Sequence, residues 1–247
     1  MLCKWDALPK FMRTEEVRPY YQALYRRRAG LAVKRTFDFA ASSVLLALLA
    51  PLFLFLAVLV KLDSKGPVFY RQERVTQYGR QFYIYKFRTM VENADRKGSL
   101  VTVGEDARIT RVGRKLRGYR LDEIPQLINI WKGEMTFVGT RPEVARYVRA
   151  YTKEMYATLL LPAGVTSEAS IRFRDEGGIL EEEVKKGKSA EKVYVENLIP
   201  GKMEWNLKAL KNFRLKSDLE VLIETAGILM GHDRFNVFPL QGKANRT

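Results

Sequence analysis

FAASSVLLALLAPLFLFLAVLV, residues Phe39 to Val60, contains no charged side chain. A straight helix of this length extends about 33 Å at ~1.5 Å per residue, enough to cross a bilayer core of roughly 30 Å. The run starts too far from the N-terminus to be a signal peptide, and it lacks a small-residue cleavage site. The stretch therefore predicts a membrane element.

Pro51 interrupts this run near its middle, where a proline removes a backbone donor and clashes with the carbonyl one turn earlier. Cationic residues flank both ends of the run: Arg26, Arg27, Arg28, Lys34 and Arg35 before it, and Lys61, Lys65, Arg71, Arg74 and Arg80 after it. Cationic flanks favour the cytoplasmic side of a membrane. A re-entrant helix that enters and leaves by the same face explains both observations, and a single spanning helix with a proline kink is the alternative.

The motif KRTFDF stands just before and within the start of the apolar run. Lys34 and Arg35 precede Asp38 by four and three residues, which are spacings that share one face of a helix. An unpaired Asp would be costly at this depth. We therefore expect Asp38 to pair with Lys34 or Arg35 at the membrane boundary.

The composition is strongly basic, with 43 Lys and Arg against 28 Asp and Glu and a net charge of +15. Such a surplus indicates an anionic partner: nucleic acid, an anionic membrane face, or phosphorylated substrates. No nucleic-acid motif accompanies it, which argues against a nucleic-acid partner. Cys3 and His232 are the only residues of their kinds, so a disulfide framework and a His-based zinc site are excluded. Chemistry must run on carboxylates, hydroxyls, Lys and Arg, with Mg²⁺ as the metal that suits oxygen ligands.

Two adjacent carboxylates, Asp122 and Glu123, occur in RLDEIPQLINIW at the end of the most basic segment. Acids in the first turn of a helix complement its dipole, at about 0.3–1 kcal/mol. The chemical alternative is an aspartate nucleophile that attacks a phosphate already neutralised by cations. Lys86, Arg117 and Arg141 are candidate cations for this role, and Mg²⁺ on Asp122 would polarise the phosphate.

The motifs KRTFDF, KFRTM, RITRVGRKLR and RLDEIPQLINIWKGEMTFVGTRPE, together with the proline-broken run, resemble the bacterial sugar transferase family over about residues 34–170. These are monotopic phosphoglycosyl transferases that start lipid-linked glycan assembly. The resemblance implies transfer of a sugar 1-phosphate from a UDP-sugar to polyprenol (undecaprenyl) phosphate, with release of UMP. It also implies a place in the bacterial inner membrane, on the cytoplasmic face and among its lipids.

The resemblance also assigns roles to single residues. Asp122 matches the covalent nucleophile, which also contacts Mg²⁺, and Glu123 matches its partner and base. The residues that match substrate-binding positions are Lys86, Arg117, Arg141 and Pro142, and those that match the re-entrant helix are Lys34, Arg35, Asp38 and Pro51. Thr140 replaces a proline of the family signature, and Pro162-Ala163-Gly164 and Ser167-Glu168 also depart from it, so no particular sugar follows.

The predicted fold class is a mixed, helix-rich α+β domain that is membrane-associated and monotopic, with a re-entrant helix and a small β-hairpin. The chain divides into an N-terminal interfacial segment (1–33), the re-entrant helix (34–62), a catalytic domain on the cytosolic face (63–231) and a C-terminal tail (232–247). Apart from the hairpin in residues 67–87, we expect a basic amphipathic helix or a pair of turns in 106–120, a short helix ending at Gly133 and a strand in TFVG. Further helices are expected over 143–160, 202–212 and 216–230.

Two other functions remain open at this stage. A membrane-tethered protein could use its basic surface to hold anionic lipid or nucleic acid. A glycosyltransferase that moves only the sugar would release UDP in place of UMP. The apolar faces of residues 202–230 suit either membrane contact or self-association into a homodimer.

Overall fold

The computed structural model describes residues 2–92, 94 and 106–231. The tail expected at 232–247, with His232, lies outside the described residues. The helices are α1 (Arg18–Arg26), α2 (Arg28–Leu48), α3 (Ala50–Asp63), α4 (Arg111–Gly118), α5 (Gln126–Lys132), α6 (Ala145–Val148), α7 (Glu168–Arg172), α8 (Glu176–Lys185), α9 (Ala190–Val193), α10 (Ile199–Lys211) and α11 (Leu215–Leu229). The strands are β1 (Phe69–Val75), β2 (Gln81–Phe87), β3 (Met135–Val138) and β4 (Ala163–Thr166). The mixed, helix-rich class with small sheets is confirmed.

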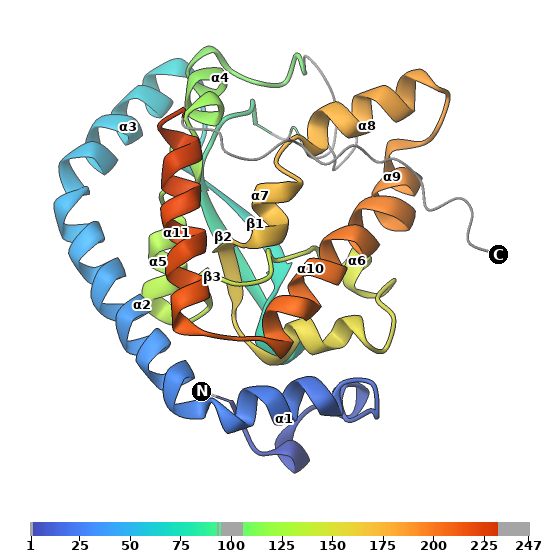
Figure 1. Ribbon diagram of the computed structural model, residues 1–247. Coiled ribbons are helices and arrows are strands. Elements are labelled where there is room, and N and C mark those ends of the chain that lie inside the picture. Colours follow the sequence, from blue (N-terminus) through green and yellow to red (C-terminus); the bar gives the residue numbers. More distant parts are fainter. Residues whose placement is uncertain (1, 93, 95–105, 232–247) are drawn as a thin grey trace.

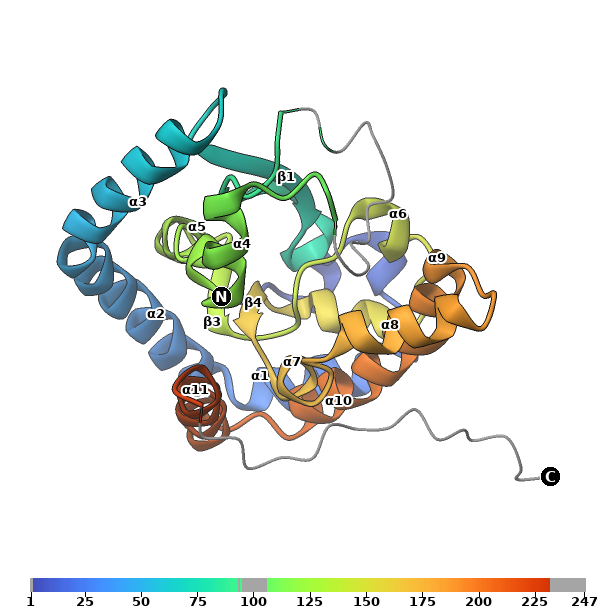
Figure 2. The ribbon, with the colours of Figure 1, turned by 90° about the horizontal axis from the view of Figure 1, so that it is seen from above.

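Helices α2 and α3 meet at Leu49 with a bend of 63° and form an arm along one side of the body (Figures 1 and 2). Pro51 lies in the first turn of α3, where its missing N–H would have had no helical partner. The predicted break at Pro51 is therefore confirmed. Among the described residues no single helix is long and apolar enough to span a membrane. The two helices of the bent pair, taken together, have the length and the apolar composition for it.

The expected ion pair of Asp38 with Lys34 or Arg35 is wrong. Asp38 is buried and accepts hydrogen bonds from the Thr136 hydroxyl at 2.6 Å and the Phe137 amide at 3.3 Å, both on β3. Lys34 instead lies 2.6 Å from the Asp218 carboxylate of α11. The partners of Asp38 and of Lys34 lie far away in the sequence, so helical spacing alone did not reveal these contacts.

Each half of the arm is also tied to the body by an arginine. On α2, Arg35 donates to the carbonyl of Ile130 at 2.8 Å, near the end of α5. At the far end of the arm, Arg88 comes directly after β2 and is buried. Its guanidinium donates to the carbonyls of Val60 at 3.2 Å and Ser64 at 2.6 Å. Arg88 therefore binds carbonyls that the end of α3 leaves without helical partners.

The predicted hairpin is confirmed as β1 and β2, which pair antiparallel from Phe69 opposite Phe87 to Val75 opposite Gln81. Its turn includes Tyr78 at a φ of 61°, a left-handed conformation that is uncommon for a residue other than glycine. A second sheet joins β3 and β4 in parallel. The predicted strand in TFVG is thereby confirmed as β3.

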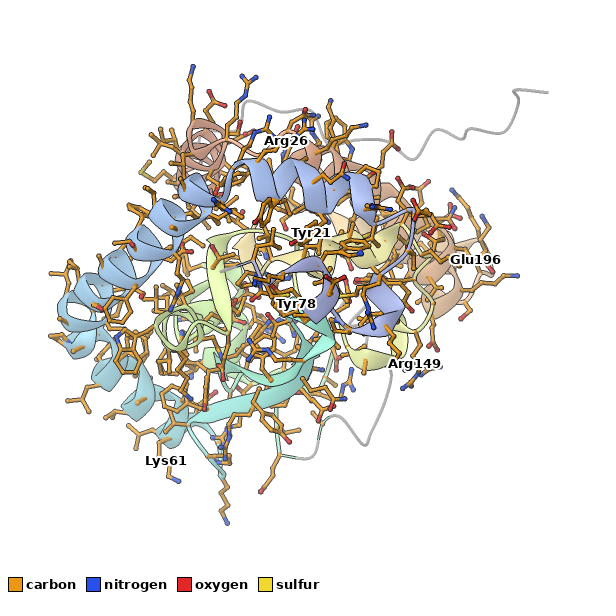
Figure 3. The ribbon with its side chains drawn as sticks, turned by 90° about the horizontal axis from the view of Figure 1, so that it is seen from below. Tyr21, Arg26, Lys61, Tyr78, Arg149 and Glu196 are labelled. Atoms are coloured by element: carbon orange, nitrogen blue, oxygen red, sulfur yellow. The ribbon has the colours of Figure 1, made fainter. Side chains whose placement is uncertain are left out.

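Helix α1, in the segment expected to be interfacial (1–33), packs on the protein through its buried aromatic and apolar residues. Tyr21 and Leu24 are buried in a core cluster with Met12, Leu160 and Phe213. Figure 3 looks onto this face, with Tyr21 and Tyr78 in its interior and Arg26 at the margin. The N-terminal segment is thus part of the hydrophobic core of the domain.

The helices expected at 202–212 and 216–230 are confirmed as α10 and α11, and the basic helix as α4. The single helix expected over 143–160 is wrong: α6 is short, and a 3-10 helix follows at Met155–Leu160. Helices α7, α8 and α9 were not predicted.

Candidate active site

The two acids stand in a short 3-10 turn, Leu121–Glu123, that precedes α5. Arg120 enters this turn in the left-handed region, with a φ of 56°. Such a conformation costs of order 1–3 kcal/mol in a residue other than glycine, and it turns the chain sharply after α4. Both acids lie in the first turn of this 3-10 helix and not in that of α5, so the structure agrees with an acidic helix start.

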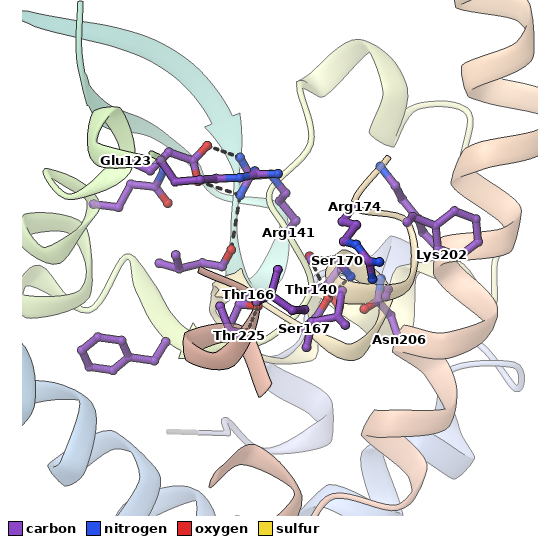
Figure 4. Close-up of a pocket in the computed structure, with 18 of the residues that line it drawn as sticks. Glu123, Thr140, Arg141, Thr166, Ser167, Ser170, Arg174, Lys202, Asn206 and Thr225 are labelled. Carbon is purple, nitrogen blue, oxygen red and sulfur yellow. Dashed lines mark hydrogen bonds and ion pairs between the residues drawn. The ribbon is translucent and has the colours of Figure 1, made fainter. Parts of the chain in front are cut away.

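Glu123 is held by cations from two other parts of the chain. Lys86, near the end of β2, places its ammonium 2.8 Å from a Glu123 carboxylate oxygen. Arg141, in the loop after β3, pairs with both carboxylate oxygens and donates to the Val165 carbonyl at 3.2 Å (Figure 4). The structure therefore brings together three predicted site residues that are far apart in sequence.

The electrostatics of this cluster keep Glu123 ionised. Burial raises the pKa of Glu123, but the charges and hydrogen bonds of Arg141 and Lys86 outweigh it and hold the pKa well below its usual value. A carboxylate with so low a pKa is a weak base at neutral pH.

Asp122 has a different environment although it is the next residue. It is 9% exposed, and no side chain in the described part of the chain donates a hydrogen bond to its carboxylate. Burial raises the pKa of Asp122, with the charge of Glu123 adding to it, while Lys86 and Arg117 act in the opposite direction. Arg117 thus lies within electrostatic range of Asp122 but forms no hydrogen bond with it.

A cavity of about 660 Å³ opens beside Glu123 (Figure 4). Glu123 and Arg141 line it on one side, and Ser167, Lys202 and Asn206, from the α7 and α10 region, line it on the other. Another part of its wall is apolar, with contributions from α2, α5 and α11. Asp122, Lys86 and Arg117 are not among its lining residues.

Sequence reasoning missed a second polar cluster in this cavity. Glu143 is buried, accepts a hydrogen bond from the Tyr194 hydroxyl at 2.6 Å and lies 3.8 Å from Arg74. Burial raises the pKa of Glu143, and Lys202 and Arg74 oppose that shift. Lys202 pairs with Glu176 on the same wall. The only sequence signal was the position of Glu143 in the TRPE stretch.

The remaining predicted residues lie outside the acid cluster. The carbonyl of Pro142 accepts a hydrogen bond from Arg74 at 3.2 Å, and its ring is buried. Lys34, Arg35 and Asp38 bind the neighbouring elements described above.

Oxygen ligands for Mg²⁺ are few around the acid pair. Within the described part of the chain, no three acidic, His or Cys residues gather closely enough to hold a metal by themselves. Mg²⁺ in phosphate sites is commonly held by one or two carboxylates together with substrate phosphates and water. Asp122 fits that role as a single ligand, whereas Glu123 is committed to its two cations.

Two cations, Lys86 and Arg141, surround the Glu123 carboxylate, and a second buried carboxylate, Asp122, is the next residue. Together with the cavity, this arrangement suits binding and attack of a phosphorylated substrate. The chain belongs to the bacterial sugar transferase family, whose sequence model matches residues 29–232.

Several curated relatives are similar. The UDP-N-acetylgalactosamine-undecaprenyl-phosphate N-acetylgalactosaminephosphotransferase of Aeromonas hydrophila is 40% identical over 143 residues, which cover 56% of this chain and 34% of the relative. A putative undecaprenyl-phosphate N-acetylgalactosaminyl 1-phosphate transferase of Bacillus subtilis is 36% identical, over 60% of this chain and 81% of the relative. The undecaprenyl-phosphate galactose phosphotransferase of Salmonella typhimurium is 30% identical, over 84% of this chain and 42% of the relative. The match thus spans less than half of two of these three relatives.

Proposed function

We propose that the protein transfers a sugar 1-phosphate from a UDP-sugar to polyprenyl phosphate through a covalent intermediate on Asp122. The observation that carries this proposal is the contrast within the acid pair. Glu123 is neutralised by Lys86 and Arg141, while the Asp122 carboxylate has no side-chain donor among the described residues. One acid is therefore committed to organising cations and the other is available to react.

In the first step an Asp122 carboxylate oxygen attacks the sugar-bearing phosphorus of the donor. A bond forms between this oxygen and phosphorus as the bond from phosphorus to the bridging oxygen breaks, and UMP leaves with that electron pair. In the second step an oxygen of polyprenyl phosphate attacks the same phosphorus and breaks its bond to Asp122. The products are UMP and a polyprenyl diphosphosugar, which balances the two substrates.

Lys86 and Arg141 are suited to stabilising the charge that develops on the transferred phosphoryl group. We propose that Glu123 positions these two cations and does not act as the base. Its low pKa makes it a poor proton acceptor. Phosphate monoesters have a second pKa of about 6, so the acceptor is largely ionised at neutral pH and needs little help from a base.

Mg²⁺ is the proposed cofactor, and Asp122 and the donor diphosphate would hold it. When bound, it would neutralise diphosphate charge and polarise the phosphorus. The residues around Asp122 supply only one uncommitted carboxylate, so most of the remaining ligands would come from substrate and water.

The proposed location is the cytoplasmic face of the bacterial inner membrane, with α2 and α3 re-entrant. Both ends of the arm are hydrogen-bonded to one body, through Arg35 near the start and Arg88 at the end. These bonds support a re-entrant arm, in which both ends lie on the same side of the bilayer. Large apolar side chains are exposed along the arm and on α11: Phe37, Phe39, Val44, Leu48, Leu54, Phe55, Val58, Leu62, Leu219, Ile223 and Leu229. An apolar surface of this extent fits contact with lipid.

The test is UMP release by the purified protein in nanodiscs with Mg²⁺, polyprenyl phosphate and a panel of UDP-sugars. Asp122→Asn should abolish UMP release, whereas Asp6→Asn, a matched change in the N-terminal segment, should leave it intact. Near-normal turnover by Asp122→Asn would overturn the nucleophile assignment. Release of UDP in place of UMP would indicate transfer of the sugar alone.

A further inference from the structure

A second cavity, of about 460 Å³, lies between α3 and α4 and is separate from the one that Glu123 lines. Helix α4 runs beside the C-terminal end of α3 (Figure 1). The apolar walls of this α3–α4 groove include Leu56, Leu59, Leu62, Val112, Leu116 and Leu121. The groove is therefore built largely from the second half of the proposed re-entrant arm.

The walls of the α3–α4 groove are held in place by the fold. The Asp63 carboxylate at the end of α3 accepts a hydrogen bond from the Val112 amide at 2.9 Å, which joins the two helices. Leu56 and Leu116 are buried in one core cluster with Phe87 of the hairpin. A groove with both walls anchored in this way is preformed, as ligand sites usually are.

The rim of the groove is cationic. Arg111 and Lys115 line it, are exposed, and form no ion pair with a described residue. Asp63 is the only acid that lines the groove, and its carboxylate is occupied by the Val112 amide. An apolar channel with a cationic rim complements an amphiphile with a long apolar chain and an anionic head.

The α3–α4 groove and the larger cavity share one short turn of the chain. Leu121 lines the α3–α4 groove, Glu123 lines the larger cavity, and Asp122 stands between them in one turn of chain. Tyr119, 74% exposed, marks the open side of the groove. The turn Leu121–Glu123 therefore lines both chambers, the α3–α4 groove through Leu121 and the larger cavity through Glu123.

We propose that the α3–α4 groove binds the isoprenoid chain of the polyprenyl phosphate acceptor, while the larger cavity receives the nucleotide sugar. This assignment rests on the proposed function. Arg111 and Lys115 supply positive charge at the groove's rim for the acceptor phosphate. Because the two chambers are separate, UMP can leave from one side while the acceptor enters from the other.

The experiment fills the groove without touching the acid cluster. Leu59→Trp places a larger ring in the groove, and Val58→Trp makes the same change on a neighbouring residue of α3 that is 49% exposed and does not line it. Loss of chain burial in the groove should raise the acceptor KM of Leu59→Trp by about tenfold or more. Val58→Trp should keep the wild-type acceptor KM.

A second readout separates this inference from the proposed function and from misfolding. The burst of UMP formed from donor alone should be unchanged in Leu59→Trp, since the donor chamber is untouched. An unchanged burst with an unchanged acceptor KM would overturn the groove assignment while leaving the proposed function intact. No UMP from the wild-type protein would instead contradict the proposed function.

Direct labelling tests the occupant. A polyprenyl phosphate that carries a photoreactive diazirine in its chain should label peptides from residues 52–63 and 111–121 of the wild-type protein. Unlabelled polyprenyl phosphate should suppress this labelling, and an equal amount of phosphatidylglycerol should not. Equal competition by phosphatidylglycerol would mean that the groove holds ordinary membrane lipid and would overturn the proposal.

Discussion

The Lys34 ammonium lies 2.6 Å from the Asp218 carboxylate and joins α2 to α11 across 184 positions of sequence. Both side chains are largely buried. Burial raises the pKa of Asp218, and the Lys34 charge opposes that shift. The pair therefore anchors the C-terminal helix to the base of the arm.

Lys34→Met should lower the free energy of unfolding by about 2 kcal/mol, somewhat less than the loss of a partner from a fully buried pair. The reason is that Asp218 would be left buried without its cation. Thermal unfolding in detergent measures the change. Lys216→Met is the matched control because Lys216 is exposed and 3.8 Å from Glu220, and its loss should change stability by less than about 1 kcal/mol.

The double variant Lys34→Met/Asp218→Leu extends this test. Replacing both partners with apolar side chains should recover much of the stability lost in Lys34→Met, because no buried charge remains. A double variant as unstable as the sum of the two single changes would contradict the pairing.

Arg88 and Gly66 give a second prediction, at the other end of the arm. Gly66 has a φ of 120°, and a Cβ there would stand 2.2 Å from an Arg88 guanidinium nitrogen. Gly66→Ala should therefore displace the guanidinium that binds the last carbonyls of α3. We expect a loss of about 2–3 kcal/mol from strain and weakened charged hydrogen bonds, together with faster proteolysis near residue 65. Gly187→Ala is the control, since its φ of 83° is also left-handed but nothing lies near its Cβ. Equal losses in both variants would assign the effect to backbone strain alone.

The raised pKa of Asp122 gives a third prediction. Attack on phosphorus requires the ionised carboxylate, so the UMP burst should fall as pH drops through a pKa above the ordinary value of 3.8. Lys86→Met removes a cation that lowers this pKa and should move the acid limb to higher pH. Glu123→Gln removes an anion that raises it and should move the limb to lower pH. Both variants should also be slower, so the position of the limb is the quantity to compare.

A pH profile of the burst rate in the wild-type protein and the two variants measures these shifts. Movement of both limbs in the same direction would contradict the opposed charges assigned to Lys86 and Glu123. An acid limb that is absent from the wild-type profile would contradict an ionised Asp122 as the attacking group.

Local signals allowed much of the fold to be predicted. Alternating β-branched and aromatic residues predicted the hairpin, and Gly133, at a φ of 82°, ends α5 as expected. The sequence predicted that Lys86, Arg117 and Arg141 would lie near the acid pair. It did not predict that Lys86 and Arg141 would both pair with Glu123. Long-range partners were not predicted. Helical spacing placed Asp38 beside Lys34, but in the folded chain Asp38 accepts hydrogen bonds from the Thr136 hydroxyl and the Phe137 amide of β3. Glu143 and Lys202 were missed because the partners that mark their cluster, Tyr194, Arg74 and Glu176, lie far from them in the sequence.

The fourth prediction concerns topology, because both ends of the arm are bound to the same body. In a Cys3→Ser background, Ala29→Cys and Lys65→Cys place thiols near the two ends, and Leu48→Cys places one at the bend, where Leu48 is 71% exposed. In intact spheroplasts an impermeant maleimide should label none of the three. In inverted vesicles it should label positions 29 and 65, while position 48 should resist because lipid surrounds it. Labelling of one end from outside and the other from inside would establish a spanning arm. A spanning arm would require the hydrogen bonds that tie it to the body, through Arg35 and Arg88, to break in the membrane. Thermal unfolding in nanodiscs checks independently whether these bonds persist there. The Arg35→Met and Arg88→Met variants should each be destabilised.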